Sequence, residues 1–264
     1  MTNTLKIYQV DAFTDHLFGG NPAAVCILNH WLDDQLMQSI AAENNLSETA
    51  FVVPRDGIFE IRWFTPTIEV NLCGHATLAT GYVLFNCLNY QERELIFKSR
   101  KRGELKVIRK NENLFLDFPA DPPQPVNLSS DIEKCLGVKP LEMYKGTTDL
   151  MAVLEDESAV SEIQPDFAKV AKLDARALMV TAKGSQVDFV SRFFAPQSGI
   201  NEDPVTGSAH TMLIPYWSER LNKEEMRAKQ LSARGGDLVC IHKGKRCLIG
   251  GLAKLYLTGE IYLV

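Results

Sequence analysis

Three side chains able to carry protons lie at positions where the surrounding sequence would hold them in place: Glu48, His75 and Asp203. Glu48 precedes the apolar run AFVV at 50–53, so partial burial would raise the pKa of its carboxyl towards that of a general base. His75 starts an apolar segment, where burial and a helix N-terminus would both keep the imidazole neutral. Asp203 precedes Pro204 in a loop, where it could reach a substrate or cap a helix. Each residue alone also has an ordinary structural explanation: an exposed carboxylate, a core histidine or a cap.

Two stretches of the chain repeat one pattern. Residues 62–77 read RWFTPTIEVNLCGHAT, and residues 192–210 read RFFAPQSGINEDPVTGSAH, which is three residues longer. Both begin with Arg, two aromatic residues, a small residue and Pro, and both contain Gly, a polar residue and Ala near the end. A repeat spaced by about half the chain predicts two duplicated lobes rather than a solenoid of short units.

Each copy leads into an apolar segment that we predict to be a buried helix, over residues 75–87 in the first lobe and 208–221 in the second. Free N–H groups and the positive end of the dipole make a helix N-terminus a binding site for anions. Two such ends acting together would hold a small acidic molecule. The alternative is ordinary capping, with Ser208 as an N-cap and Gly74 in a tight turn.

The rest of the pattern is mostly short strands with alternating apolar residues. We expect strands at 6–13, 23–28, 50–53, 59–64, 94–97, 105–109, 114–118 and 187–195, and a further series over 230–264. A surface helix is predicted over 32–43, with smaller peripheral helices at 130–136 and 165–173. Pro215 would remove one backbone donor from the second buried helix.

The best linker is the proline-rich stretch 121–125, which should be stiff and poor at pairing in a sheet. We therefore predict lobes of residues 1–119 and 120–264. The final strand, 260–264, would belong to either lobe.

Composition limits the possible partners. The 264 residues are 45% hydrophobic and 23% charged, with a net charge of -5. This charge argues against nucleic acid, whose phosphates require a clustered excess of Lys and Arg. The N-terminus lacks the features of a signal peptide, and no window approaches 18 apolar residues. We expect a cytoplasmic protein without a membrane partner.

The cysteines do not form a disulfide or zinc pattern. Six of them are scattered without a CxxC pair, which favours reduced thiols. Two Cys-x-His pairs, Cys73/His75 and Cys240/His242, each supply half of a tetrahedral ligand set, so we predict no metal. Neither a phosphate-binding loop nor a dinucleotide-binding glycine pattern is present in the right context, so no cofactor is expected.

Several ordered motifs, taken together, resemble those of a known family. They are DAF at 11–13, FGGNPAAV at 18–25, NLSET at 45–49, LCGHAT at 72–77 and EDPVTGSAH at 202–210. With them, nearly the whole chain resembles the phenazine biosynthesis-like (PhzF-like) family of the diaminopimelate epimerase-like superfamily.

The resemblance implies an α+β fold of two pseudo-symmetric lobes, each a β-barrel-like sheet around a central helix, with the active site between them. It implies a cofactor-independent isomerase that moves a proton between carbons of a small carboxylate. Glu48 matches the general base, and His75 and Asp203 match its proton-carrying partners. The substrate-binding residues that the match implies are Asn21, Ser47, Gly74, Gly207 and Ser208.

Cys73 leaves two alternatives open. Related epimerases carry one of two catalytic cysteines at this position, whereas the second copy has Asp203 and no thiol. An amino-acid epimerase or racemase using Cys73 is therefore one alternative, although a buried inert cysteine is the more ordinary explanation. The other is a ligand-binding member of the family without turnover. Relatives also suggest a homodimer.

Overall fold

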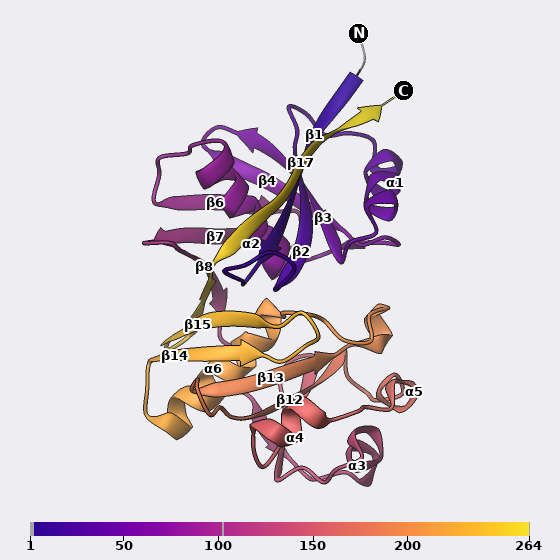
Figure 1. The fold of residues 1–264 in the computed structure, drawn as a ribbon, viewed down its shortest axis with the longest axis vertical. Coiled ribbons are helices and arrows are strands. Elements are labelled where there is room, and N and C mark those ends of the chain that lie inside the picture. The colour runs from indigo at the N-terminus through magenta and orange to yellow at the C-terminus, as the bar shows by residue number, and fades with distance from the viewer. Residues whose placement is uncertain (1–2, 102, 264) are drawn as a thin grey trace. The chain divides into compact units, whose positions relative to one another are not determined.

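The computed structural model describes residues 3–101 and 103–263. The chain divides into two compact units (Figure 1), Met1–Asp117 with Gly250–Val264, and Phe118–Ile249. Both units combine a sheet with helices. Within the described residues, no helix is long and apolar enough to cross a membrane.

The first unit is a sheet around one short buried helix. In chain order its elements are β1 (Asn3–Ala12), β2 (Asn21–Ile27), α1 (Asp34–Asn44), β3 (Glu48–Arg55), β4 (Ile58–Phe64), β5 (Glu69–Val70), α2 (Gly74–Tyr82), the π-helix η1 (Val83–Cys87), β6 (Glu94–Ser99), β7 (Gly103–Lys110), β8 (Asn113–Pro119) and, from the C-terminus, β17 (Ala253–Leu263). Helix α2 packs on β1, β2 and β3. All its residues from His75 to Gly81 are buried, which confirms the expected buried helix.

The second unit also contains a buried helix among its strands. Its elements are β9 (Gln124–Val126), α3 (Ser130–Leu136), β10 (Glu142–Lys145), β11 (Asp149–Val153), α4 (Glu157–Glu162), α5 (Phe167–Val170), β12 (Ala177–Lys183), β13 (Phe189–Phe194), the 3-10 helix η2 (Pro196–Ser198), α6 (Gly207–Leu221), β14 (Glu225–Gln230), β15 (Gly236–Lys243) and β16 (Arg246–Gly251). Helix α6 is buried along most of its length and contains Pro215.

Strand pairing repeats between the units. In the first, β2 and β3 are parallel, β3 and β4 antiparallel, β4 and β6 parallel, and β6 and β7 antiparallel. In the second, β11 to β15 follow the same series of parallel, antiparallel, parallel and antiparallel pairs. The buried helix follows the third strand of each series. The duplication seen in the sequence is therefore a duplication of topology.

The arginine that opens each repeat anchors the loop before the buried helix. Arg62 binds Glu69 through Nε and Nη2, both at 2.8 Å. Arg192 binds Glu202 in the same way, at 2.7 and 3.0 Å. The arginine and glutamate are seven residues apart in the first copy and ten in the second (69 − 62 and 202 − 192). The three extra residues thus lie inside the loop that the ion pair closes.

Two parts of the chain differ from the expected division at residue 120. β17 pairs with β1 along its whole length, so residues 250–264 lie with the first unit rather than with residues 120–249. The proline-rich stretch is also not a plain linker, because β9 pairs with β10 and places Pro125 opposite Tyr144. A proline tolerates a strand position where no N–H is required.

Candidate active site

The first unit brings together three side chains from two parts of its sequence. Glu48 is the first residue of β3, and Cys73 and His75 lie at the start of α2. The Nε2 atom of His75 is 3.2 Å from Oε2 of Glu48, and their side chains are only 6% and 14% exposed. The Sγ atom of Cys73 is 3.6 Å from Nδ1 of His75. The result is a buried carboxylate–imidazole pair in contact with a thiol.

The predicted substrate-binding residues of this unit lie along the same elements. Gly74 is the first residue of α2, and Ser47 directly precedes Glu48. Asn21 is fully buried at the start of β2, two residues before Ala23, which pairs with Glu48 in the β2–β3 ladder. Parallel pairing of β2 and β3 therefore brings Asn21, Ser47 and Glu48 into one region of the unit.

The pKa of His75 is shifted in the direction opposite to the one expected from the sequence. Burial alone lowers the pKa of His75, but negative charge on Cys73 and Glu48 and hydrogen bonds to both raise it well above its ordinary value. Burial also raises the pKa of the Cys73 thiol to about 11, so near neutral pH this residue is uncharged. With the thiol uncharged, the nearby carboxyl group of Glu48 is the remaining cause of the raised pKa of His75. The sequence argument counted burial and the dipole but had no distance to the carboxylate.

In the second unit, Asp203 is held in an ordered loop. The hydroxyl of Thr206 donates to Oδ2 of Asp203 at 2.6 Å. Gln230 is fully buried, donates from Nε2 to the Asp203 carbonyl at 2.7 Å and accepts from the Thr206 N–H at 2.9 Å. Sequence analysis missed Gln230, because a single glutamine at the end of a strand carries no local signal of such a contact.

The start of α6 is not capped in the way the alternative required. Thr206 occupies the N-cap position, Gly207 is the first helical residue and Ser208 the second, so Ser208 is not the N-cap. The Thr206 side chain makes no cap hydrogen bond, since its hydroxyl donates to Asp203. Helix α2 likewise begins without a side-chain cap hydrogen bond, at Cys73. Both helix starts thus keep the polarity that favours an anion.

Arg176 is a second residue that the sequence did not reveal. Its Nη2 donates to Oγ of Ser208 at 3.1 Å, and its Nε donates to the buried Asp149 at 2.8 Å. A second contact joins Nη2 to the other oxygen of Asp149. The guanidinium also lies over the ring of Phe193, 5.4 Å from its centroid. Arg176 therefore links the buried Asp149 to the start of α6 as part of an ion pair.

His210, on α6, is a buried histidine of a different kind. Its Nδ1 lies 2.9 Å from the Thr206 carbonyl, and its Nε2 has no hydrogen-bond partner among the described residues. Burial lowers the pKa of His210 from 6.5 to about 4. A depressed pKa means that the folded state binds the proton more weakly than the unfolded state.

His210 should therefore limit stability in acid. Its contribution is complete above pH 6.5 and is lost as the pH falls towards 4, by about 3 kcal/mol at pH 4. Denaturant unfolding at pH 7 and pH 4.5 should show a steeper loss for the wild type than for His210→Asn. Replacement of the exposed His30 by Gln is the matched control and should leave the wild-type loss unchanged. An equal loss in His210→Asn and wild type would contradict this assignment.

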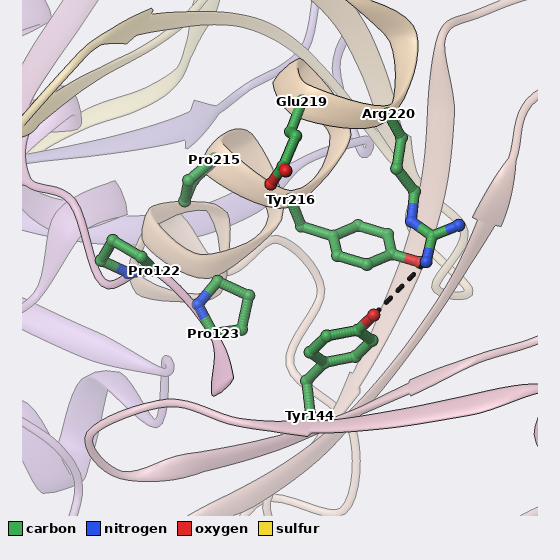
Figure 2. A pocket seen from close by; sticks show the side chains of 7 residues that line it. All are labelled: Pro122, Pro123, Tyr144, Pro215, Tyr216, Glu219 and Arg220. Carbon is green, nitrogen blue, oxygen red and sulfur yellow. Dashed lines mark hydrogen bonds between the residues drawn. The ribbon is translucent and has the colours of Figure 1, made fainter. Parts of the chain in front are cut away.

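A separate pocket of about 360 Å³ lies in the second unit (Figure 2). It is lined by Pro122, Pro123, Tyr144, Pro215, Tyr216, Glu219 and Arg220. Arg220 donates to the hydroxyl of Tyr144 at 3.3 Å and pairs with Glu142, so its charge is already balanced. The predicted site residues do not line this pocket, and its walls hold no acid–base pair, so we do not place the chemistry there.

Comparison with known proteins identifies the family of the chain. Residues 10–256 match the model of a family described as phenazine biosynthesis-like protein. The chain belongs to the phenazine biosynthesis-like family. It is 51% identical over 259 residues to an uncharacterized isomerase of Pseudomonas aeruginosa, which covers 98% of this chain and 99% of that protein. A crystal structure of a PhzF-family phenazine biosynthesis protein from Enterococcus faecalis shares 50% identity and a TM-score of 0.96, covering 99% and 100% of the two chains.

More distant structures extend the fold beyond the phenazine biosynthesis-like family. A hydroxyproline epimerase from Agrobacterium vitis has a TM-score of 0.64 at 9% identity, covering 100% of this chain and 94% of that one, and so shares the fold alone. The expected α+β fold of the diaminopimelate epimerase type is thereby confirmed. Isomerase is the kind of enzyme that the relatives of higher identity support.

Proposed function

We propose that this protein is a cofactor-independent isomerase that moves a proton from one carbon to another in a small carboxylate-bearing substrate. The observation that carries the proposal is the buried contact of 3.2 Å between Glu48 and His75 at the start of α2. A carboxylate close to a proton donor, away from water, is what abstraction of a carbon-bound proton requires.

In the proposed reaction, a carboxylate oxygen of Glu48 takes a proton from a carbon next to a double bond. The electron pair of that C–H bond shifts into the unsaturated system, and a new carbon accepts a proton, so the double bond migrates with no net change in composition. His75 stabilises the carboxylate before the transfer and can pass a proton on afterwards. The substrate leaves with its proton at the new position.

We extend the proposal to the second unit. Asp203, fixed by Thr206 and Gln230, acts as a further proton carrier. Free N–H groups at helix starts suit a substrate carboxylate, and hydrogen-bonding side chains nearby suit its other polar groups. The residues assigned to substrate binding in this way are Asn21, Ser47, Gly74, Gly207 and Ser208.

Cys73 distinguishes this proposal from an epimerase. Burial raises the pKa of its thiol to about 11, and a thiol that stays protonated is a poor base near neutral pH. We predict that Cys73→Ser keeps the exchange rate within about 10-fold of the wild type, below the effect of removing a general base. A loss as large as that of a base would assign the reaction to the thiol instead. The rate is measured by proton NMR in deuterated water.

The test of the function is a panel of small cyclic and acyclic unsaturated amino and hydroxy acids, followed by proton NMR with the wild-type protein in deuterated water. Deuterium uptake together with a shifted double bond supports the isomerase. Uptake at a stereocentre without such a shift supports the epimerase. A ligand that raises the melting temperature without any uptake on the panel favours the ligand-binding alternative.

A further inference from the structure

The Glu48, Cys73 and His75 side chains form a set of donors that the sequence did not reveal. The Cys-x-His pair alone offers two metal ligands, and the fold adds the carboxylate of Glu48 from β3. Thiolate, imidazole and carboxylate are the three ligand types that Zn²⁺ takes in proteins. Their potential ligand atoms all lie within 4.8 Å of one another.

We propose that Glu48, Cys73 and His75 bind a thiophilic divalent cation such as Zn²⁺, and that the bound ion blocks the site. The set consists of one donor from a strand and two from the start of a helix, all in a well-packed region. We call this group the zinc triad.

Two of the three donor–donor distances in the zinc triad are close to those around a tetrahedral ion, and the third is no more than 4.8 Å. Zinc bonds of roughly 2.0 Å to N or O and roughly 2.3 Å to S place neighbouring donors roughly 3.3 to 3.6 Å apart. His75 Nε2 is 3.2 Å from Glu48 Oε2 and 3.9 Å from Cys73 Sγ. The ion would displace the protons of Cys73 and His75 as it binds, because thiolate and neutral imidazole are the forms that bind metal, and the donor atoms would move only slightly. Three protein ligands also leave a fourth position for water.

The second Cys-x-His pair lacks the features that make the zinc triad a candidate metal site. Cys240 and His242 lie on β15, where the Nδ1 of His242 is 3.2 Å from Oγ of Ser218 and its Nε2 is 3.0 Å from the Gly244 carbonyl. Both ring nitrogens are thus already engaged. Among the residues the structure describes, no second group of three such donors lies this close together.

An ion in the zinc triad would occupy the lone pairs that the reaction needs. Glu48 bound to the cation no longer accepts a proton from carbon, and His75 bound through nitrogen no longer donates one. Inhibition by zinc therefore rests on the proposed role of Glu48 as the base. Binding of zinc does not rest on that role, because it depends only on the three donor side chains.

Binding is tested by calorimetric titration of ZnCl₂ into the full-length protein after EDTA treatment and removal of the chelator. Loss of a direct ligand should exceed the 10- to 100-fold effect typical of residues that only support ligands, so we expect Glu48→Gln, Cys73→Ser and His75→Gln each to weaken binding by more than about 100-fold. The double variant Cys240→Ser, His242→Gln is the matched control and should bind as the wild type does. Unchanged affinity in the triad variants, or lost affinity in the control, would overturn the site.

A second measurement uses the absorption spectrum of the wild-type protein with bound cobalt. Co²⁺ bound to the wild type should show a thiolate-to-cobalt charge-transfer band, which Cys73→Ser removes; a spectrum without that band would overturn the assignment of Cys73 as a ligand. Saturating Zn²⁺ should suppress deuterium uptake, and EDTA should restore it. Uptake that survives or increases with bound zinc would overturn the inhibition. Zinc binding by a protein that exchanges no substrate would refute the proposed isomerase while supporting the zinc triad.

Discussion

Replacement of Glu48 by Gln should lower the rate of carbon–proton exchange by about 10²- to 10⁴-fold, the range for removing a general base. The amide has nearly the same shape and can still hydrogen-bond His75, but it cannot accept a proton from carbon. We expect a lower melting temperature as well, because the buried pair with His75 is lost, so the exchange rate is measured where both proteins are fully folded. Both quantities are measured on the same preparations, with deuterium uptake followed by NMR.

Glu60 provides the matched control for this substitution. It also lies in the first unit, where its carboxylate accepts from Nε1 of Trp31 at 2.9 Å and pairs with Arg55 at 3.2 Å. Because Glu60 has no assigned role in the reaction, Glu60→Gln should keep the wild-type exchange rate. If Glu48→Gln exchanges as fast as Glu60→Gln, Glu48 takes no part in the mechanism.

Replacement of Arg192 by Met should lower the free energy of unfolding by about 3–5 kcal/mol, the cost of leaving a buried charge without its partner. The side chain of Arg192 is 10% exposed and pairs with Glu202. Its Nη1 also donates to the backbone carbonyls of residues 160, 161 and 163, at 3.3, 3.2 and 2.8 Å. The substitution therefore leaves one carboxylate and three carbonyl oxygens without their arginine partner.

Urea unfolding measures this cost. Lys134→Met is the comparison, because Lys134 and Asp131 form an exposed pair that should contribute less than about 1 kcal/mol. Replacing both Arg192 and Glu202 by Met should lower the free energy of unfolding less than replacing Arg192 alone, because no unpaired carboxylate remains. Equal costs for Arg192→Met and Lys134→Met would show that the Arg192–Glu202 pair does not hold this loop.

Much of the fold could be predicted because it depends on local patterns. The repeat at residues 62–77 and 192–210 predicted two similar units, and strand pairing in the two units repeats in the same order. Apolar composition predicted the buried helices, which begin at Gly74 and Gly207, each one residue before the expected start. The unit to which the last strand belongs could not be predicted, because β17 pairs with β1 at the other end of the chain.

The site shows where sequence reasoning reached its limit. Glu48 and His75 were recognised by motif, but their separation of 3.2 Å, which contributes to the raised pKa of His75, depends on how β3 lies beside α2. Gln230 and Arg176 contact the loop and helix start around Asp203 and Ser208 across long sequence separations. Neither belongs to a recognisable pattern. Contacts of this kind follow from tertiary packing alone.

The central claim is that Glu48 moves a proton between carbons, and the most direct measurement locates the deuterium in the product formed by the wild type in deuterated water. We predict a migrated double bond with deuterium at the newly protonated carbon, and no such product with Glu48→Gln. Deuterium confined to the original carbon, with the double bond in place and the wild-type rate retained in Glu48→Gln, would contradict the account.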